Sequence, residues 1–202
     1  MTGRFVSLEG VDGCGKSTQA ALLAVALRTA GHEVVVTREP GGTPLGESVR
    51  EILLQSGGDM APVAEALLFA ASRAEHVATV IRPTLARGGW VVCDRFVDSS
   101  LAYQGAARGL GIDAVWAINA PAVDGCLPDL TIVLQVPPAV AAARDDAPKD
   151  RIEVEGLALQ EAVADGYREL ATRFPERIAL VPAEGSVADV HAQVMALVQE
   201  LA

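Results

Sequence analysis

A glycine-rich stretch near the start of the chain has the residue types needed to hold phosphate groups. It runs Gly10-Val11-Asp12-Gly13-Cys14-Gly15-Lys16-Ser17-Thr18 and matches the pattern GxxxxGK[ST]. In such a loop, backbone N–H groups and the N-terminus of the following helix surround phosphate oxygens. Lys16 would bridge the β- and γ-phosphates of a nucleotide, and Ser17 would offer its hydroxyl to Mg²⁺. The stretch predicts a nucleoside triphosphate site; the alternative is an ordinary glycine-rich turn with a solvated lysine.

Two acidic residues and an arginine accompany this loop. The carboxylate of Asp12 would be repelled by the phosphates of the donor, so we expect it to face the acceptor, unless it is a solvated turn residue. Asp94 ends the apolar run from Val91, and a carboxylate at the end of a buried strand commonly lies beside Mg²⁺ in nucleotide-binding proteins. Ser17 and Asp94 are therefore the predicted metal ligands, and Arg95 would reach into the same cleft.

The surrounding segments alternate between short apolar runs and stretches with helical periodicity. The predicted strands are residues 5–8, 33–37, 90–94, 130–136 and 178–181. The predicted helices are residues 18–30, 45–55, 62–86 and 186–201, the last beginning at a capping-box-like Ser186 and Asp189. This alternation predicts an α/β fold of the P-loop NTPase type, with a five-stranded parallel sheet and helices on both faces. Ligands then bind at the carboxyl ends of the strands.

Composition and charge limit the classes of partner. The 202 residues carry 16 Lys plus Arg against 26 Asp plus Glu, a net charge of −10, which argues against nonspecific nucleic-acid or anionic-membrane binding. The lysines are Lys16 and Lys149, so any role for an ammonium group falls on one of them. No secretory or transmembrane segment is indicated, and three separated cysteines favour a reduced, cytoplasmic protein. Residues 1–202 are predicted to form one domain.

Four stretches together closely resemble bacterial thymidylate kinases. Their order and spacing match as well, and further similarity at residues 150–153 and 166–167 extends the resemblance over most of the chain. The stretches are Leu8 to Gly13, Arg38 to Thr43, Leu68 to Arg73, and Asp94 to Gly105. The resemblance implies transfer of the γ-phosphoryl group of ATP to dTMP with Mg²⁺, giving dTDP and ADP in dTTP synthesis. It also implies a nucleoside monophosphate kinase-like domain and a homodimer formed through the apolar faces of long helices.

The resemblance assigns a thymine pocket to two pairs of residues, each four apart and so on one helix face. Phe69 would stack on the base while Arg73 donates to an exocyclic oxygen; taken alone, this pair would be a core ring and a solvated charge. Ser100 and Gln104 would contact the other polar edge of thymine. Tyr103 would lie beside the sugar, where it excludes a 2′-hydroxyl.

The same resemblance assigns the rest of the acceptor. Asp12 would take the 3′-hydroxyl and help place the acceptor phosphate near Mg²⁺, and Arg95 would bind that phosphate. Glu39, in the Pro-Gly-Gly loop, and Arg50, on the following helix, would complete the pocket, although either could be a surface charge.

A mobile basic segment closes over ATP in this family, and here it corresponds to residues 144–151. The phosphate loop contains no arginine, so Arg144 and Arg151 are the candidates to stabilise charge on the transferred phosphoryl group. Asp145 and Asp146 oppose this assignment because carboxylates near a triphosphate weaken its binding. The alternative is a solvated surface loop of mixed charge.

The histidines His32, His76 and His191 lie outside every motif and are predicted to be surface residues. Phosphoryl transfer to a phosphate depends on positioning and electrostatics, so no general base is required. Two other functions stay open from the residues alone: a P-loop kinase for another nucleoside monophosphate or a small metabolite such as shikimate, and a nucleotide-dependent switch or partner-binding ATPase. The thymine-pocket residues disfavour the first, and the missing NKxD guanine motif disfavours a GTP switch.

Overall fold

Five parallel strands form a sheet with the order β2-β3-β1-β4-β5 in the computed structural model, which describes residues 3–55, 59–144 and 150–201. The strands are β1 (Arg4–Glu9), β2 (Val34–Arg38), β3 (Trp90–Asp94), β4 (Leu130–Gln135) and β5 (Ile178–Pro182). All neighbouring pairs are parallel. The predicted α/β fold and its five strands are therefore confirmed.

Strand β1 lies at the centre of the sheet and brings the site residues to one edge. Its residues Phe5 to Glu9 are buried, as expected for a parallel strand covered on both faces. In the register between β1 and β3, Leu8 pairs with Asp94. The residues that follow these two strands, the phosphate loop and Arg95, consequently emerge side by side.

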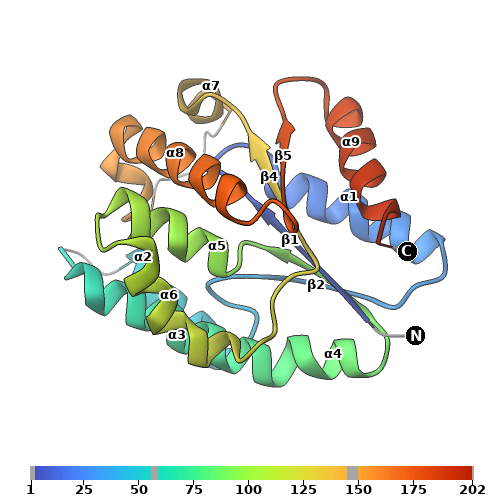
Figure 1. Ribbon diagram of the computed structural model, residues 1–202, viewed down its shortest axis with the longest axis horizontal. Coiled ribbons are helices and arrows are strands. Elements are labelled where there is room, and N and C mark those ends of the chain that lie inside the picture. Colours follow the sequence, from blue (N-terminus) through green and yellow to red (C-terminus); the bar gives the residue numbers. More distant parts are fainter. Residues whose placement is uncertain (1–2, 56–58, 145–149, 202) are drawn as a thin grey trace.

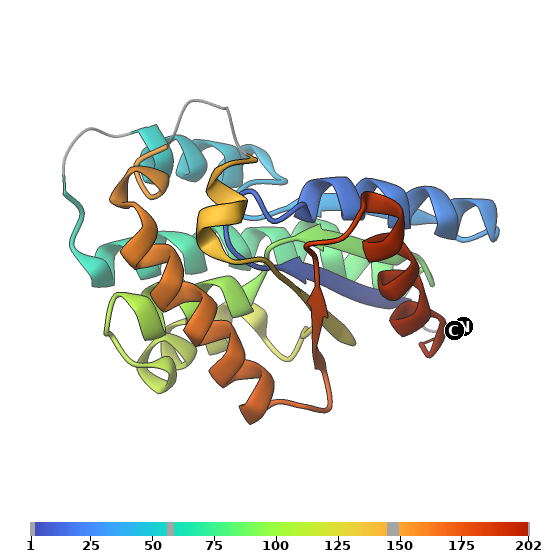
Figure 2. The ribbon, with the colours of Figure 1, turned by 90° about the horizontal axis from the view of Figure 1, so that it is seen from above.

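Helices cover both faces of the sheet (Figure 1). Their bounds are α1 (Lys16–Thr29), α2 (Pro44–Gln55), α3 (Pro62–His76), η1 (Val77–Ile81), α4 (Arg82–Ala86), α5 (Val97–Ser100), η2 (Leu101–Ala107), α6 (Ile112–Val123), α7 (Pro138–Ala142), η3 (Glu153–Glu155), α8 (Leu157–Arg173) and α9 (Val187–Gln199). Figure 2 shows that β1 begins and α9 ends on the same side of the molecule, away from the loops that follow β1 and β3. None of the described helices combines the length and apolar character that crossing a membrane requires.

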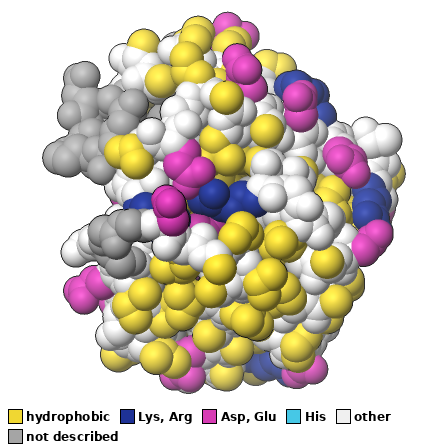
Figure 3. Space-filling view, turned by 90° about the vertical axis from the view of Figure 1, so that its left-hand side faces the viewer, with side chains coloured by type: hydrophobic (Ala, Val, Ile, Leu, Met, Phe, Trp, Pro, Cys, Tyr) yellow, Lys and Arg dark blue, Asp and Glu magenta, His cyan; other side chains and the backbone are white. Residues whose placement is uncertain are grey.

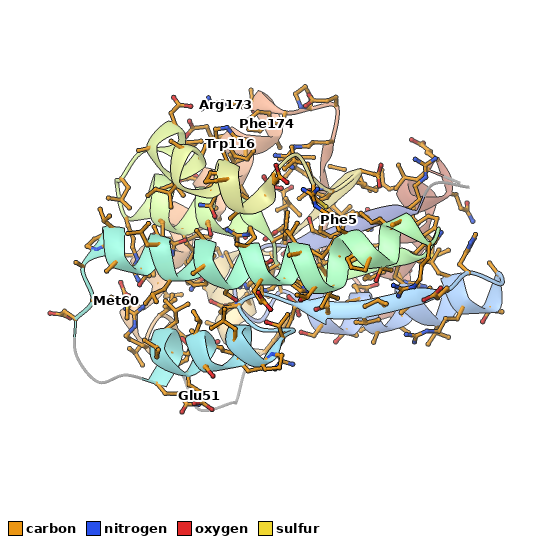
Figure 4. All side chains as sticks on the ribbon, turned by 90° about the horizontal axis from the view of Figure 1, so that it is seen from below. Phe5, Glu51, Met60, Trp116, Arg173 and Phe174 are labelled. Atoms are coloured by element: carbon orange, nitrogen blue, oxygen red, sulfur yellow. The ribbon has the colours of Figure 1, made fainter. Side chains whose placement is uncertain are left out.

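The long helix predicted over residues 62–86 is continuous but changes its winding. Figure 4 shows α3, η1 and α4 as one rod, in which η1 is a π-helical turn. Pro83 follows that turn and has no backbone N–H to donate, so the local hydrogen-bond pattern must change near it. Phe5 lies between β1 and this rod (Figure 4), and its ring meets that of Phe96 edge to face at 4.9 Å.

Helix α9 begins at the capping box that the sequence predicts. Ser186 Oγ accepts a hydrogen bond from the Asp189 backbone N–H at 3.2 Å, and the Asp189 carboxylate accepts one from the Ser186 backbone N–H at 3.3 Å. These bonds satisfy donors at the first turn of the helix.

Candidate active site

The phosphate loop joins β1 to α1 and depends on glycines for its course. Gly10, Gly13 and Gly15 have φ values of 133°, 77° and 100°, in the left-handed region that side chains disfavour. At Gly13 a Cβ would lie 2.2 Å from the carbonyl oxygen of Ala141 in α7. The loop is therefore packed directly against the helix that precedes residues 144–151.

Lys16 and Ser17 begin α1 and turn toward β3. Lys16 is 7% exposed, and its Nζ donates to the carbonyl oxygen of Val11 at 2.8 Å, which holds the ammonium group over the loop. Ser17 Oγ donates to Asp94 Oδ2 at 2.5 Å. The two predicted metal ligands are thus adjacent.

This oxygen pair fits Mg²⁺. The described residues hold no group of three or more His, Cys, Asp or Glu that could form an all-protein metal site. Mg²⁺ in nucleotide sites commonly takes only one or two protein oxygens and completes its shell with phosphates and water. Ser17 and Asp94 supply that donor set.

Asp12 is held by a cluster of donors rather than by solvent. Its carboxylate forms an ion pair with Arg95 and accepts hydrogen bonds from Tyr103 Oη at 3.1 Å and Gln160 Nε2 at 3.0 Å. Burial raises the pKa of Asp12, but the nearby charges of Arg95 and Lys16 outweigh burial and lower it to about 2. Asp12 is therefore a carboxylate at neutral pH, and it points at Arg95.

Arg95 follows β3 with a backbone conformation that is unusual for a residue with a side chain. Its φ is 70°, in the left-handed region. The guanidinium donates to the carbonyl oxygen of Gly10 at 3.0 Å and to Ser99 Oγ at 3.2 Å. Burial lowers the pKa of Arg95, but the phenol of Tyr103 and the Asp12 carboxylate have the larger, opposite effect. The net pKa lies well above the usual value of arginine. A permanent cation is thereby fixed beside the phosphate loop.

Glu9 is a site residue that the sequence analysis missed. It ends β1, is fully buried, and accepts hydrogen bonds from Phe96 N at 2.7 Å, Ser99 Oγ at 2.5 Å and Tyr167 Oη at 2.8 Å. Burial, and secondly the charge of Asp98, raise its pKa to about 7. The signal was available, because an acid at the end of a buried strand is the feature that identified Asp94.

One cavity of about 280 Å³ unites the two groups of predicted residues. Asp12, Lys16, Ser17 and Asp94 line one side of it. The acceptor candidates on its lining are Glu39, Arg50, Phe69, Arg95, Ser100, Tyr103 and Gln104. Figure 3 shows acidic and basic side chains gathered in a furrow on the side of the molecule toward which the strands point.

Arg73 lies behind the cavity wall rather than on it. It is 1% exposed, and all three of its guanidinium nitrogens donate to protein groups. Nε is 2.8 Å from Glu39 Oε2, Nη1 is 3.2 Å from Ser100 Oγ and also bonds Asn119, and Nη2 is 3.1 Å from the carbonyl oxygen of Phe96. In this structure Arg73 orders Glu39 and Ser100, and its direct contact with a base stays a prediction.

The prediction that His76 is a surface residue was wrong. Its side chain is 0% exposed, with Nδ1 2.9 Å from Glu39 Oε1 and Nε2 2.7 Å from Thr37 Oγ1. His76 lies three residues after Arg73 on the same face of α3, so both reach the loop that follows β2. His32 and His191 are partly exposed.

The two candidate lid arginines lie apart from the phosphate loop. Arg144 donates to the carbonyl oxygen of Ala183 at 3.1 Å. Arg151 donates to the carbonyl oxygen of Leu53 at 2.7 Å and forms an ion pair with Glu65. The structure therefore does not bring either guanidinium to Lys16. Asp145, Asp146 and Lys149, which the sequence analysis also placed in the lid, lie outside the described residues.

Further polar residues that support the site belong to no sequence motif. Gln160 on α8 binds Asp12, Asn119 on α6 binds Arg73, and Glu65 on α3 binds Gln104. Each is separated from its partner by at least 39 residues along the chain. Spacing could not reveal them, because only the folded topology brings the partners together.

The fold and the site define a P-loop phosphotransferase, with a phosphate loop on one side of the cavity and a pocket for a second substrate on the other. Residues 8–194 match the family model described as thymidylate kinase. The chain belongs to the thymidylate kinase family.

Individual relatives agree with this assignment. A thymidylate kinase of Rhizorhabdus wittichii is 48% identical over 100% of this chain and 99% of its own. One from Clavibacter sepedonicus is 49% identical over 98% and 97% of the two chains. A crystal structure of thymidylate kinase from Ehrlichia chaffeensis superposes with a TM-score of 0.80 at 32% identity, covering 98% of this chain and 99% of that one.

Proposed function

We propose that this chain transfers the γ-phosphoryl group of ATP to dTMP, giving dTDP and ADP for dTTP synthesis. The observation that carries the proposal is the single cavity lined both by the phosphate loop and by the predicted thymine pocket. Phosphoryl transfer requires the two substrates to be held in line, and one cavity with both linings can do so. Membership of the thymidylate kinase family supports the choice of acceptor.

On the donor side, the loop N–H groups and Lys16 bind the triphosphate of ATP. Ser17 and Asp94 hold Mg²⁺ together with phosphate oxygens. When bound, the ion offsets negative charge on the phosphates. The observed contact between Ser17 and Asp94 supports this pairing.

On the acceptor side, Phe69 stacks on thymine, and Ser100 and Gln104 contact its polar edge. The Tyr103 ring lies beside the sugar and Asp12 takes the 3′-hydroxyl. Hydrogen bonds from Tyr103 and Gln160 hold the Asp12 carboxylate ready for this role. Burial of the cavity wall makes each of these contacts stronger than it would be in water.

Arg95 binds the phosphate of dTMP and fixes the attacking oxygen. Its ion pair with Asp12 and its bond to the carbonyl oxygen of Gly10 hold the guanidinium beside the phosphate loop, which supports this role. Glu39 and Arg50 complete the pocket. Arg144 and Arg151, proposed to stabilise the transferred phosphoryl group, must first leave the partners that hold them in this structure.

The proposal is tested by coupled ADP release with a panel of nucleoside monophosphates. We expect rapid turnover with dTMP, and little with dGMP, dAMP or dCMP. Turnover that is equally fast without any acceptor would favour an ATPase and contradict the proposal. Activity with another monophosphate but not dTMP would make the chain a different nucleotide kinase.

We also propose a homodimer, which rests on the family resemblance, and a cytoplasmic location, which rests on the separated cysteines and the lack of a predicted secretory segment. Val63 and Leu67 on α3 are 50% and 54% exposed, and Trp116 on α6 is 36% exposed. Figure 3 shows hydrophobic side chains gathered on this side of the molecule, a pattern that fits an interface between long helices. Sedimentation at micromolar concentration is expected to give a dimer, and a strict monomer would contradict it.

A further inference from the structure

A buried carboxylate lies directly behind the predicted thymine pocket. Glu65, one turn before Phe69 on α3, is 0% exposed. Its Oε1 accepts from Gln104 Nε2 at 2.8 Å and from Arg108 Nε at 2.6 Å, and its Oε2 pairs with Arg151. Glu65 is therefore held by two guanidinium groups while it binds a residue of the cavity lining.

This arrangement decides which way the Gln104 amide points. A carboxylate paired with two guanidinium groups is acceptor-only and has no proton to donate. The atom of Gln104 that faces Glu65 must consequently be the NH₂ group. Turning the amide over would place its carbonyl oxygen against a buried carboxylate, with no donor between them.

The amide oxygen of Gln104 is the polar atom of this side chain that does not face Glu65. No hydrogen bond from the described residues reaches this oxygen, and the side chain of Gln104 lines the cavity beside Ser100 and Phe69. A carbonyl oxygen that opens onto a cavity and has no partner in the protein is a ready acceptor for a substrate N–H.

We propose that Glu65 is a positioning residue that sets base specificity by fixing the Gln104 amide with its oxygen toward the acceptor base. The inference rests on the proposed function. An oxygen at this point accepts from the N3–H of thymine or uracil and opposes the N3 lone pair of cytosine. The site thus selects 4-oxopyrimidines with an N3 proton, through a residue that never contacts the base.

Two arginines, Arg108 and Arg151, bind Glu65, so the loss of one contact leaves the other in place. Arg108 also bonds Glu155 with distances of 2.6 and 2.9 Å, which anchors it independently of Glu65. If Arg151 leaves to join ATP, Arg108 still pairs with Glu65. The orientation of Gln104 is therefore maintained whether or not the segment around Arg151 moves.

The first test compares kcat/KM for dTMP and dCMP in the wild type and in Glu65→Gln. A glutamine at position 65 can donate as well as accept, so the Gln104 amide becomes free to turn. We expect the preference for dTMP over dCMP to fall by about tenfold or more, since a site built for a donor rejects an analogue that lacks it. Glu155→Gln, which removes the other partner of Arg108, is the matched control and should keep the wild-type preference.

The second test shows whether Glu65 acts through Gln104. Gln104→Leu removes the amide oxygen and should by itself lower the preference for dTMP over dCMP, a result that does not depend on whether Glu65→Gln folds. In the Gln104→Leu background, Glu65→Gln should change the preference no further. Thermal unfolding of each variant separates lost stability from lost discrimination.

The outcomes separate the inference from the function beneath it. No wild-type turnover with dTMP removes the proposed function and this inference with it. Normal wild-type turnover with an unchanged preference in Glu65→Gln or in Gln104→Leu overturns the inference alone. A shift that persists undiminished in the double variant assigns Glu65 a structural effect and also overturns it.

Discussion

The two walls of the cavity bind by different means. The phosphate-loop wall comes mostly from the short continuous stretch Gly10–Ser17, with its main-chain groups and Lys16, and is joined by Asp94 at the end of β3. The acceptor wall consists of side chains from α2, α3, α5, η2 and the loops that follow β2 and β3, ordered by buried ion pairs such as Arg73 with Glu39. A loop of backbone donors can be formed locally, whereas a wall of side chains exists only once the whole fold has assembled.

The difference matters for energetics. The side chains of Arg73 and Glu39 are 1% and 3% exposed, so losing one partner leaves a buried charge without its ion pair. By contrast, the Lys16 ammonium is tethered only by neutral groups of its own loop, the carbonyl oxygen of Val11 at 2.8 Å and Cys14 Sγ at 3.8 Å. Substitutions in the phosphate loop should therefore affect turnover and leave folding intact, while substitutions in the acceptor wall should affect both.

The largest effect is expected from Lys16→Ala. Removing the ammonium group that stabilises charge on the phosphates should lower kcat/KM by about 10³-fold. The free energy of unfolding should change by only about 1 kcal/mol, because one hydrogen bond to a carbonyl and one weak bond to sulfur are lost. Steady-state kinetics and urea unfolding measure the two quantities. Near-normal turnover would remove Lys16 from the donor site, and loss of folding would erase the contrast between the walls.

Arg73→Ala tests the other wall. It should cost about 3 kcal/mol or more of stability, because Glu39 is left buried without its cation. It should also weaken dTMP far more than ATP, since Ser100 loses a partner. The matched control is Arg87→Ala, which breaks an ion pair with Glu33 whose side chains are 46% and 56% exposed and should cost less than about 1 kcal/mol.

Chemical unfolding and separate KM values for the two substrates decide the outcome. Equal losses of dTMP and ATP affinity would show that Arg73 does not support the acceptor wall. A stability cost no larger than that of Arg87→Ala would show that the buried ion pair between Arg73 and Glu39 does not stabilise the fold.

Glu9, buried at the end of β1 directly before the phosphate loop, supplies a pH-dependent prediction. Its pKa rises from 4.5 to about 7 on folding. Between these values the folded chain keeps a proton that the unfolded chain has released. The free energy of unfolding therefore decreases as the pH rises through this window, by about 3 kcal/mol in total.

Glu9→Gln should remove this contribution. Urea unfolding at several pH values between 4.5 and 7 measures the slope, and Glu33→Gln, at an exposed position, is the control with the wild-type slope. Identical slopes in Glu9→Gln and the wild type would show that Glu9 does not titrate in this range. Asp12 does not interfere, because its pKa is lowered to about 2.

Ser186→Ala gives the smallest effect and a baseline outside both walls. Loss of the cap of α9 should cost about 1 kcal/mol of stability. Turnover with dTMP and ATP should stay at the wild-type level. A large change in kcat/KM would mean that a loss of stability far from the cavity also lowers activity, which the contrast between the walls does not predict.

Most of the fold was predictable because its signals are local. The valines of β2 and the apolar run of β4 predict buried strands, and each observed strand lies within about two residues of its predicted bounds. The π-helical turn η1 was not predicted, because the apolar spacing around it is compatible with an ordinary helix.

Whether a site residue could be predicted from the sequence depends on whether its signal is local. Lys16, Ser17 and Asp94 were predicted from a motif and a strand end, and the structure brings them together. His76 and Glu65 were missed because their partners, Glu39 and Gln104, come from other elements. A histidine or glutamate on a helix has the same sequence signature whether it faces solvent or a buried partner.

The close approach of Gly13 to Ala141 bears on how the cation for phosphoryl transfer is supplied. The phosphate loop contains no arginine, and the resemblance noted above assigns this cation to residues 144–151. In this chain α7 fills the space beside position 13, and the φ of 77° there disfavours any side chain. Moving the cation into the loop would require the backbone of the loop and the position of α7 to change together. An arginine introduced at position 13 alone is therefore expected to strain the loop and to clash with α7.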